Sequence, residues 1–146
     1  MLSARDVANY FLALASEEEG ELISNLKLQK LVYYAQGFSL AIRGKPLFQE
    51  SIEAWTHGPV VPSLYREFKE YGSAAVEPPS DFTFDSFDPE IQELLDEVYS
   101  VYGQYSASGL RTLTHSEPPW KDAPGGQVIP LATMRDYFKT LVNVED

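Results

Sequence analysis

Two short segments hold the side chains that could do chemistry, and each combines a tryptophan, a histidine and proline. They are residues 54–62 (AWTHGPVVP) and 114–120 (THSEPPW), and His57 and His115 are the only histidines of the chain. The two histidines are too far apart to form a metal-ligand pair on one helix. Tryptophan beside rigid proline is typical of protein–protein contacts, and it is also typical of loops that are held against the core of their own domain. Both interpretations stay open, with the structural one favoured for Trp120.

Catalytic motifs are absent from the sequence. It has no GxSxG elbow, no GxxxxGK[ST] phosphate loop and no GxGxxG fingerprint. With no cysteine there is no thiol nucleophile and no thiolate metal site. His115 and Glu117 match the HxE of zinc deaminases superficially, but that site needs cysteine ligands. We therefore expect no enzyme activity, no cofactor and no metal; an enzyme with an unrecognised site is a minor alternative.

Acidic residues outnumber basic ones two to one. The chain has 22 Asp and Glu against 11 Lys and Arg, a formal net charge of -11, and no Lys or Arg lies between Glu70 and Leu110. Such a surface repels phosphate backbones and attracts basic protein surfaces, so we expect a protein partner and no direct nucleic-acid binding. No apolar run reaches the roughly 18 residues of a membrane span and no secretory pattern is present. We expect a cytoplasmic protein without membrane contact.

One helix is expected to position the rest of the chain. Ser24 or Asn25 can cap its start, and Gly44 can close its end. Apolar residues recur at helical spacing over most of its circumference: Leu28, Leu31, Val32, Ala35, Phe38 and Ile42. A helix of this kind belongs in the middle of a domain. Its remaining polar side chains, Lys27 and Lys30 among them, are expected to meet water or a partner.

Shorter elements are expected around this central helix. Start signals and apolar periodicity predict further helices that begin near Ser3, Pro62, Pro89, Ser106 and Leu131. Residues 51–56 predict a short strand that is broken at 57–59 and pairs with 128–129. Residues 114–124 hold too many prolines for a helix. The acidic run 16–21 and the phenylalanine-rich segment 73–88 predict loops, the second laid over the core.

Together these elements predict a mainly α fold. We expect a single compact helical domain over residues 1–146, built around a central buried helix, with a small two-stranded β ribbon.

Two long segments closely resemble the Panacea domain, which is found in antitoxins of bacterial and phage toxin–antitoxin systems. They are residues 26–72 (LKLQKLVYYAQGFSLAIRGKPLFQESIEAWTHGPVVPSLYREFKEYG) and 106–123 (SASGLRTLTHSEPPWKDA), and VIPLATMRDYF fits the closing strand and helix. The resemblance implies a mostly helical antitoxin, of bacterial or prophage origin, that neutralises a cognate toxin of a type II system by direct binding. SocA-type members deliver their toxin to the ClpXP protease, so a proteolytic adaptor for such an AAA+ protease is the alternative.

Under this hypothesis an acidic domain can cover a basic substrate site on its toxin. The candidate contacts lie on the expected exposed side of the central helix, beside it and on the third helix. They are Lys27, Lys30, Tyr34, Trp55, His57 and Tyr65.

Overall fold

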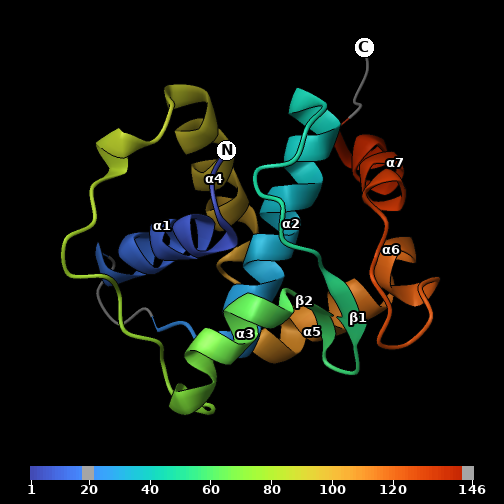
Figure 1. Cartoon of the computed structure of the whole chain (residues 1–146), viewed down its shortest axis with the longest axis horizontal. Helices are drawn as coiled ribbons and strands as arrows, with labels where there is room; N and C mark the ends of the chain where they lie inside the picture. The colour runs from blue at the N-terminus through green and yellow to red at the C-terminus, as the bar shows by residue number, and fades with distance from the viewer. Residues whose placement is uncertain (18–21, 143–146) are drawn as a thin grey trace.

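The helix α2 (Asn25–Arg43) runs through the middle of the molecule (Figure 1). The computed structural model describes residues 1–17 and 22–142. The Ser24 side chain accepts the backbone N–H of Lys27 at 3.3 Å and caps the start. Gly44 ends the helix at φ 76°, a left-handed conformation that glycine adopts without a steric penalty. Both expected ends of the central helix are confirmed.

The other elements surround α2. Those packed against it are α1 (Ala4–Glu17), α3 (Pro62–Phe68), α4 (Pro89–Tyr102), α5 (Ala107–His115), α7 (Leu131–Val142) and the strand β2 (Gly58–Val60). The connection from α3 to α4 begins with one 3₁₀ turn, Lys69–Tyr71, and has a second, Phe84–Ser86, near its end. Because neighbours cover α2 from several directions, 14 of its 19 residues are buried. The mainly α fold around a central buried helix is confirmed.

The small β ribbon is confirmed, and the expected pairing with residues 128–129 forms beside a hairpin that the sequence did not predict. Strand β1 (Glu53–Trp55) pairs antiparallel with β2, with Glu53 opposite Val60 and Trp55 opposite Gly58. The expected break at 57–59 is therefore the turn and start of a hairpin. On the other edge of β1, Val128 bridges to Glu53, the N–H of Ile129 donates to the carbonyl of Ile52 at 2.8 Å, and the N–H of Ala54 donates to that of Gln127 at 2.9 Å. A two-residue turn closes at a lower entropic cost than a loop of some seventy residues, so the hairpin takes the main pairing.

The proline-rich segment contains helix, which corrects the expectation for residues 114–124. The helix α5 reaches His115, and a one-turn helix α6 (Pro118–Lys121) follows it. Both prolines of α6 stand in its first turn. Backbone N–H groups in a first turn have no intrahelical partner, so proline loses nothing there.

Ser3 and Asp6 have the spacing of a capping box in the sequence, and they form a reciprocal cap at the start of α1. Ser3 Oγ accepts the N–H of Asp6 at 3.0 Å, and Asp6 Oδ2 accepts the N–H of Ser3 at 2.9 Å. The helix extends to Glu17, into the run expected to be a loop; residues 18–21 of that run lie outside the described residues.

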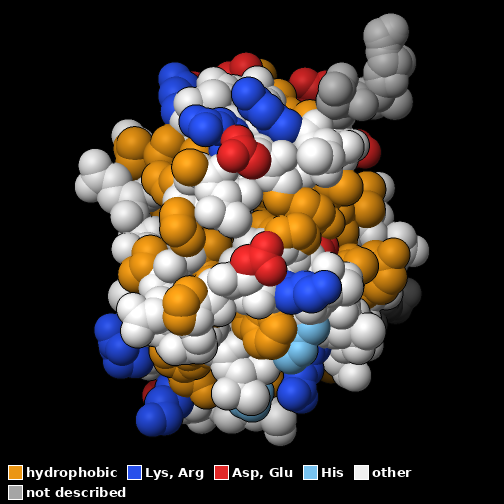
Figure 2. Space-filling model, turned by 90° about the vertical axis from the view of Figure 1, so that its right-hand side faces the viewer, with side chains coloured by type: hydrophobic (Ala, Val, Ile, Leu, Met, Phe, Trp, Pro, Cys, Tyr) orange, Lys and Arg blue, Asp and Glu red, His pale blue; other side chains and the backbone are white. Residues whose placement is uncertain are grey.

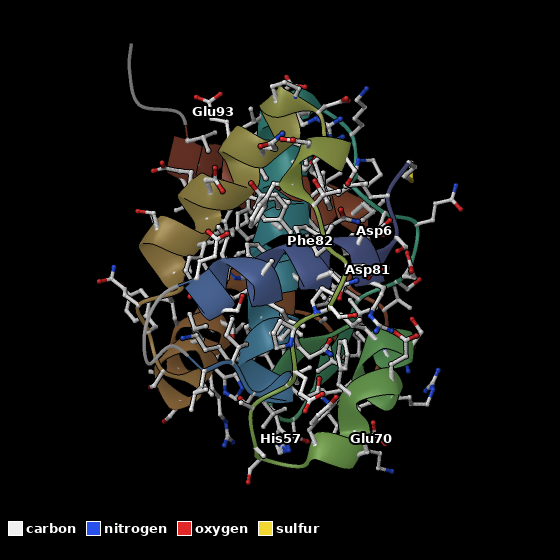
Figure 3. All side chains as sticks on the ribbon, turned by 90° about the vertical axis from the view of Figure 1, so that its left-hand side faces the viewer. Asp6, His57, Glu70, Asp81, Phe82 and Glu93 are labelled. Atoms are coloured by element: carbon white, nitrogen blue, oxygen red, sulfur yellow. The ribbon has the colours of Figure 1, made fainter. Side chains whose placement is uncertain are left out.

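The phenylalanine-rich segment passes alongside α1 (Figure 3). Phe82, Phe84 and Phe87 surround the ring of Tyr10, with ring centroids 6.0, 5.0 and 5.0 Å away. The loop laid over the core is thus confirmed. Edge-to-face aromatic contacts of this kind stabilise a loop that has little regular structure.

Candidate partner-binding site

The two tryptophan–histidine segments meet at one pocket of about 660 Å³. The β hairpin supplies Trp55 and His57 on one side, and α5 and α6 supply Arg111, His115 and Trp120 on the other. In the lower part of Figure 2, histidine side chains lie beside hydrophobic ones, with Lys or Arg side chains above and below them. The pocket exists only because the fold brings together segments that are far apart in the sequence.

Trp120 holds the two walls of this pocket together. Its indole Nε1 donates to the backbone carbonyl of Trp55 at 2.7 Å. Its ring stacks on His115 with a centroid separation of 3.8 Å and an interplanar angle of 4°. The structural role favoured for Trp120 is therefore supported, and the shape of the pocket depends on it.

The pocket is an electropositive region of an acidic protein. Arg111 and Lys121 are exposed at its rim, and neither forms an ion pair with any described residue. Burial and the charges of Lys30 and Arg111 lower the pKa of His57. Burial and the charge of Arg111 likewise lower the pKa of His115, although the backbone of Thr56 opposes the change. Both rings are therefore mainly neutral at pH 7, and Arg111, Lys121 and Lys30 provide the positive potential.

Three of the expected contact residues lie together at this site. Trp55 and His57 line the pocket, and Tyr65 on α3 packs edge-on against the Trp55 ring at 5.1 Å. His57 is exposed, while Trp55 and Tyr65 are half-buried.

The other three do not lie on an exposed side of α2, so that expectation is wrong. Lys27, Lys30 and Tyr34 are 8%, 1% and 0% exposed. The reason is that neighbouring elements cover the side of α2 that carries them. Hydrogen bonds to the ammonium group offset part of the free-energy cost of burying a lysine. Lys27 Nζ donates to the carbonyl of Gly103 at 2.7 Å, and Lys30 Nζ donates to that of Leu26 at 3.2 Å.

Lys30 supports the pocket from beneath. A side chain on Gly58 of the hairpin would meet Lys30 Cε at 3.1 Å, so the lysine lies directly against β2. Burial and the nearby charge of Arg111 lower the pKa of Lys30 to about 8, which leaves it mostly protonated at pH 7.

Tyr34 belongs to a buried cluster around Glu117, the residue before α6. The carboxylate of Glu117 accepts hydrogen bonds from the hydroxyl groups of Tyr33, at 3.1 Å, and Tyr34, at 2.9 Å. Tyr137 of α7 is a third hydrogen-bond partner. Burial raises the pKa of Glu117 to about 7, against the opposing effect of these hydrogen bonds. The cluster ties α2, α6 and α7 together and so positions the helix that carries Trp120.

The candidate contacts predicted from the sequence do not include Arg111, Lys121 or His115. A signal was present: Arg111 and His115 are four residues apart, which places them on one face of a helix. The sequence around these two residues, however, does not indicate that this helix face lies opposite Trp55 in the fold.

Among the described residues, no three His, Asp or Glu side chains are placed to share a metal ion. None of their helices combines the length and apolar character that a membrane crossing requires.

Known proteins similar to this chain are antitoxins. Residues 28–121 match the family described as "Antitoxin SocA-like, Panacea domain". Antitoxin SocA of Caulobacter vibrioides (strain NA1000 / CB15N) is 36% identical over 137 residues, covering 82% of this chain and 69% of that protein. No solved structure matches the chain. The matched range contains most of the pocket, from Ala54 to Lys121. The chain therefore belongs to the family of antitoxins with a SocA-like Panacea domain.

Proposed function

We propose that this protein neutralises a cognate toxin of a type II toxin–antitoxin system by binding the toxin directly, and that it catalyses no reaction. The observation that carries the proposal is the pocket that the two motifs form together within the matched domain. It has two tryptophans in its walls and an arginine at its rim, residue types that are enriched among the side chains that dominate binding energy at protein interfaces. No carboxylate lines it to act with the histidines, so it has the composition of a contact surface.

The contact residues of this proposal are Trp55, His57 and Tyr65, joined by Arg111 at the rim of the pocket. Lys30 and Tyr34 act beneath them, Lys30 against the hairpin and Tyr34 through Glu117. Lys27 is placed further from the pocket, at the carbonyl of Gly103. The binding of the toxin thus depends on a few exposed side chains and on a buried layer that positions them.

The experiment is co-expression with the cognate toxin, which is sought among the proteins encoded by the adjacent genes. Cells that make that protein alone should stop growing, and cells that also make this chain should recover. Trp55→Ala combined with Tyr65→Ala should weaken the complex of the purified proteins at least about 10-fold, because central aromatic contacts each contribute about 1 kcal/mol or more. The control is Tyr105→Ala, an aromatic side chain 41% exposed outside the pocket.

Circular dichroism and thermal unfolding of each variant separate loss of contact from loss of fold. Wild-type affinity in the folded double variant would remove Trp55 and Tyr65 from the interface. Failure of the wild-type chain to restore growth would refute the antitoxin proposal itself.

Delivery of the toxin to an AAA+ protease such as ClpXP is the alternative mechanism, and the same cells distinguish it. An antitoxin that blocks its toxin still protects cells that lack the protease and leaves toxin abundance unchanged. An adaptor stops protecting such cells, and the toxin accumulates. Both mechanisms place the protein in the cytoplasm and need neither nucleic acid nor a membrane.

A further inference from the structure

The pocket between the hairpin and α5–α6 joins apolar walls to a cationic rim. Its walls include Ala54, Trp55, Trp120 and Ala123, and Gly125 and Gly126 border it. A side chain built on either glycine would meet no atom within 4 Å, so this border is open to a partner. A volume of about 660 Å³ is within the range that holds a few side chains of a peptide.

The cations at the rim have no partner among the described residues. Of the five arginines, Arg5, Arg43 and Arg135 form ion pairs with acids at 3.3 to 3.5 Å, whereas Arg66 and Arg111 do not. Lys121 is also unpaired, and it lies at the same rim as Arg111. Exposed lysines elsewhere in the described chain, such as Lys45 and Lys139, are unpaired too, but this pocket has two cations and no acid among its lining residues, which favours an anionic occupant.

Two acids adjoin pocket residues in the chain, Glu53 and Asp122, and neither forms an ion pair with Arg111 or Lys121. Glu53 precedes the wall residue Ala54, and its carboxylate accepts the indole N–H of Trp55 at 2.9 Å. It does not line the pocket. The guanidinium group of Arg111 is therefore free to hold an incoming carboxylate through two parallel hydrogen bonds.

The helix ends around the pocket favour a carboxylate over a phosphate. Phosphate sites usually rely on backbone N–H groups at a helix start. Here the start of α6 consists of Pro118 and Pro119, which have no N–H. The end of α5 at His115 carries the partial negative charge of a helix C-terminus, which opposes any anion, and opposes a doubly charged phosphate group more than a singly charged carboxylate.

We propose that this pocket binds an acidic–aromatic segment of the toxin, with a carboxylate against Arg111 and Lys121 and an aromatic side chain between the tryptophan walls. This inference rests on the proposed antitoxin function and adds the chemistry of the contact. Many basic proteins can approach an acidic antitoxin. An acidic residue in the right place on the toxin lets the pocket select among them, because partners with a basic residue there are repelled.

Both tryptophans of the chain line the pocket, so their two indole N–H signals in a ¹H–¹⁵N NMR spectrum report on its occupancy. The probe is the capped peptide acetyl-Asp-Phe-Asp-amide. Its comparisons are the neutral isostere acetyl-Asn-Phe-Asn-amide, the basic peptide acetyl-Lys-Phe-Lys-amide and AMP. The acidic peptide should shift both signals with a Kd in the millimolar range, and the neutral peptide should bind at least about 5-fold more weakly.

The matched variants change two positive charges each. Arg111→Gln with Lys121→Gln should weaken binding of the acidic peptide about 10-fold, the loss expected for two charge-assisted hydrogen bonds. Lys45→Gln with Lys139→Gln removes two exposed lysines outside the pocket and should change nothing. The rim side chains are exposed and make no hydrogen bond to a described residue, so their variant should fold normally.

Equal binding of the acidic and neutral peptides overturns the proposal, as does tighter binding of AMP or binding of none of the probes. The growth assay supplies the remaining distinction. If the Arg111→Gln, Lys121→Gln variant still protects cells fully, the toxin does not occupy the pocket, and this inference fails while the antitoxin function stands. If the wild-type chain does not protect cells, the antitoxin function fails whatever the peptides do.

Discussion

At the scale of single residues, the polar side chains of α2 bind the protein's own backbone. Gln29 Oε1 accepts the N–H of Val61 at 2.9 Å, just before α3. Gln36 donates to the carbonyl of Phe48 at 2.9 Å and accepts the N–H of Leu47 at 2.7 Å. Each amide satisfies buried backbone groups of a segment that has few regular hydrogen bonds of its own. Positions expected to meet solvent therefore hold the turns of the chain against the central helix.

Replacement of Gln36 by leucine should destabilise the fold. The substitution keeps the apolar bulk but leaves a buried N–H and a buried C=O without partners, each of which costs about 1–3 kcal/mol. Urea unfolding followed by circular dichroism measures the loss. The exposed Gln49, changed to leucine, is the control and should stay within about 0.5 kcal/mol of the wild type. A Gln36→Leu protein as stable as the control would show that these hydrogen bonds contribute nothing net.

Glu117 should make stability fall as the pH rises from about 4.5 to about 7. Its pKa is raised by burial from 4.5 to about 7, so the unfolded chain loses this proton at a lower pH than the folded one. The contribution is fully present below pH 4.5 and lost by about pH 7, and the total is on the order of 3 kcal/mol. Glu117→Gln removes this titration while an amide oxygen can still accept hydrogen bonds. The measurement is the difference in unfolding free energy between the two proteins at several pH values; a difference independent of pH would contradict the expectation.

At the scale of elements, the contact between α2 and α7 depends on one missing side chain. A Cβ on Gly37 would overlap the ring of Phe138, and Phe138 is itself fully buried. The glycine lets the ring of Phe138 approach the backbone of α2. This close contact fixes α7, which also supplies Tyr137 to Glu117.

Gly37→Ala should destabilise the protein by roughly 1–3 kcal/mol through overpacking, although alanine is the better helix former by about 1 kcal/mol. The matched control is Gly109→Ala in α5, where the added Cβ would lie 3.3 Å from Ser106 Oγ, a side chain that can adjust. The control should be neutral or slightly stabilising. Thermal unfolding of both variants measures the two changes in stability. An equal increase in stability in both would contradict the prediction, because it would mean that α7 moves away from α2 at no cost in free energy.

At the scale of the whole molecule, charge is unevenly distributed. Figure 3 shows Asp6, Glu70, Asp81 and Glu93 spread over the side that carries α1, the 73–88 segment and α4. The unpaired cations Arg111 and Lys121 lie instead at the pocket formed by the hairpin, α5 and α6. A broad acidic side suits long-range attraction of a basic partner, whereas a small cationic pocket suits short-range selection.

The association rate with the toxin should therefore depend on salt. Raising NaCl from 0.05 to 0.5 M should slow association several-fold, on the order of 3- to 10-fold, because the Debye length shortens below the distance over which the acidic side acts. The dissociation rate should change little. Stopped-flow fluorescence of the two tryptophans measures both rates. An association rate that is insensitive to salt would leave the excess of acidic residues without a role in binding.

The sequence by itself determined the mainly α class, the ends of α2, the cap of α1 and the relation to Panacea antitoxins. These features depend on residues a few positions apart, or on long motifs that can be compared directly. Only the tertiary structure decided that Lys30 is buried, that β1 pairs with β2, and that Trp55 and His115 share a pocket. Such facts depend on which elements cover a given side of a helix and on the entropic cost of closing loops of different lengths. Net charge is likewise a property of the sequence, but whether Arg111 finds an acid is decided by the fold.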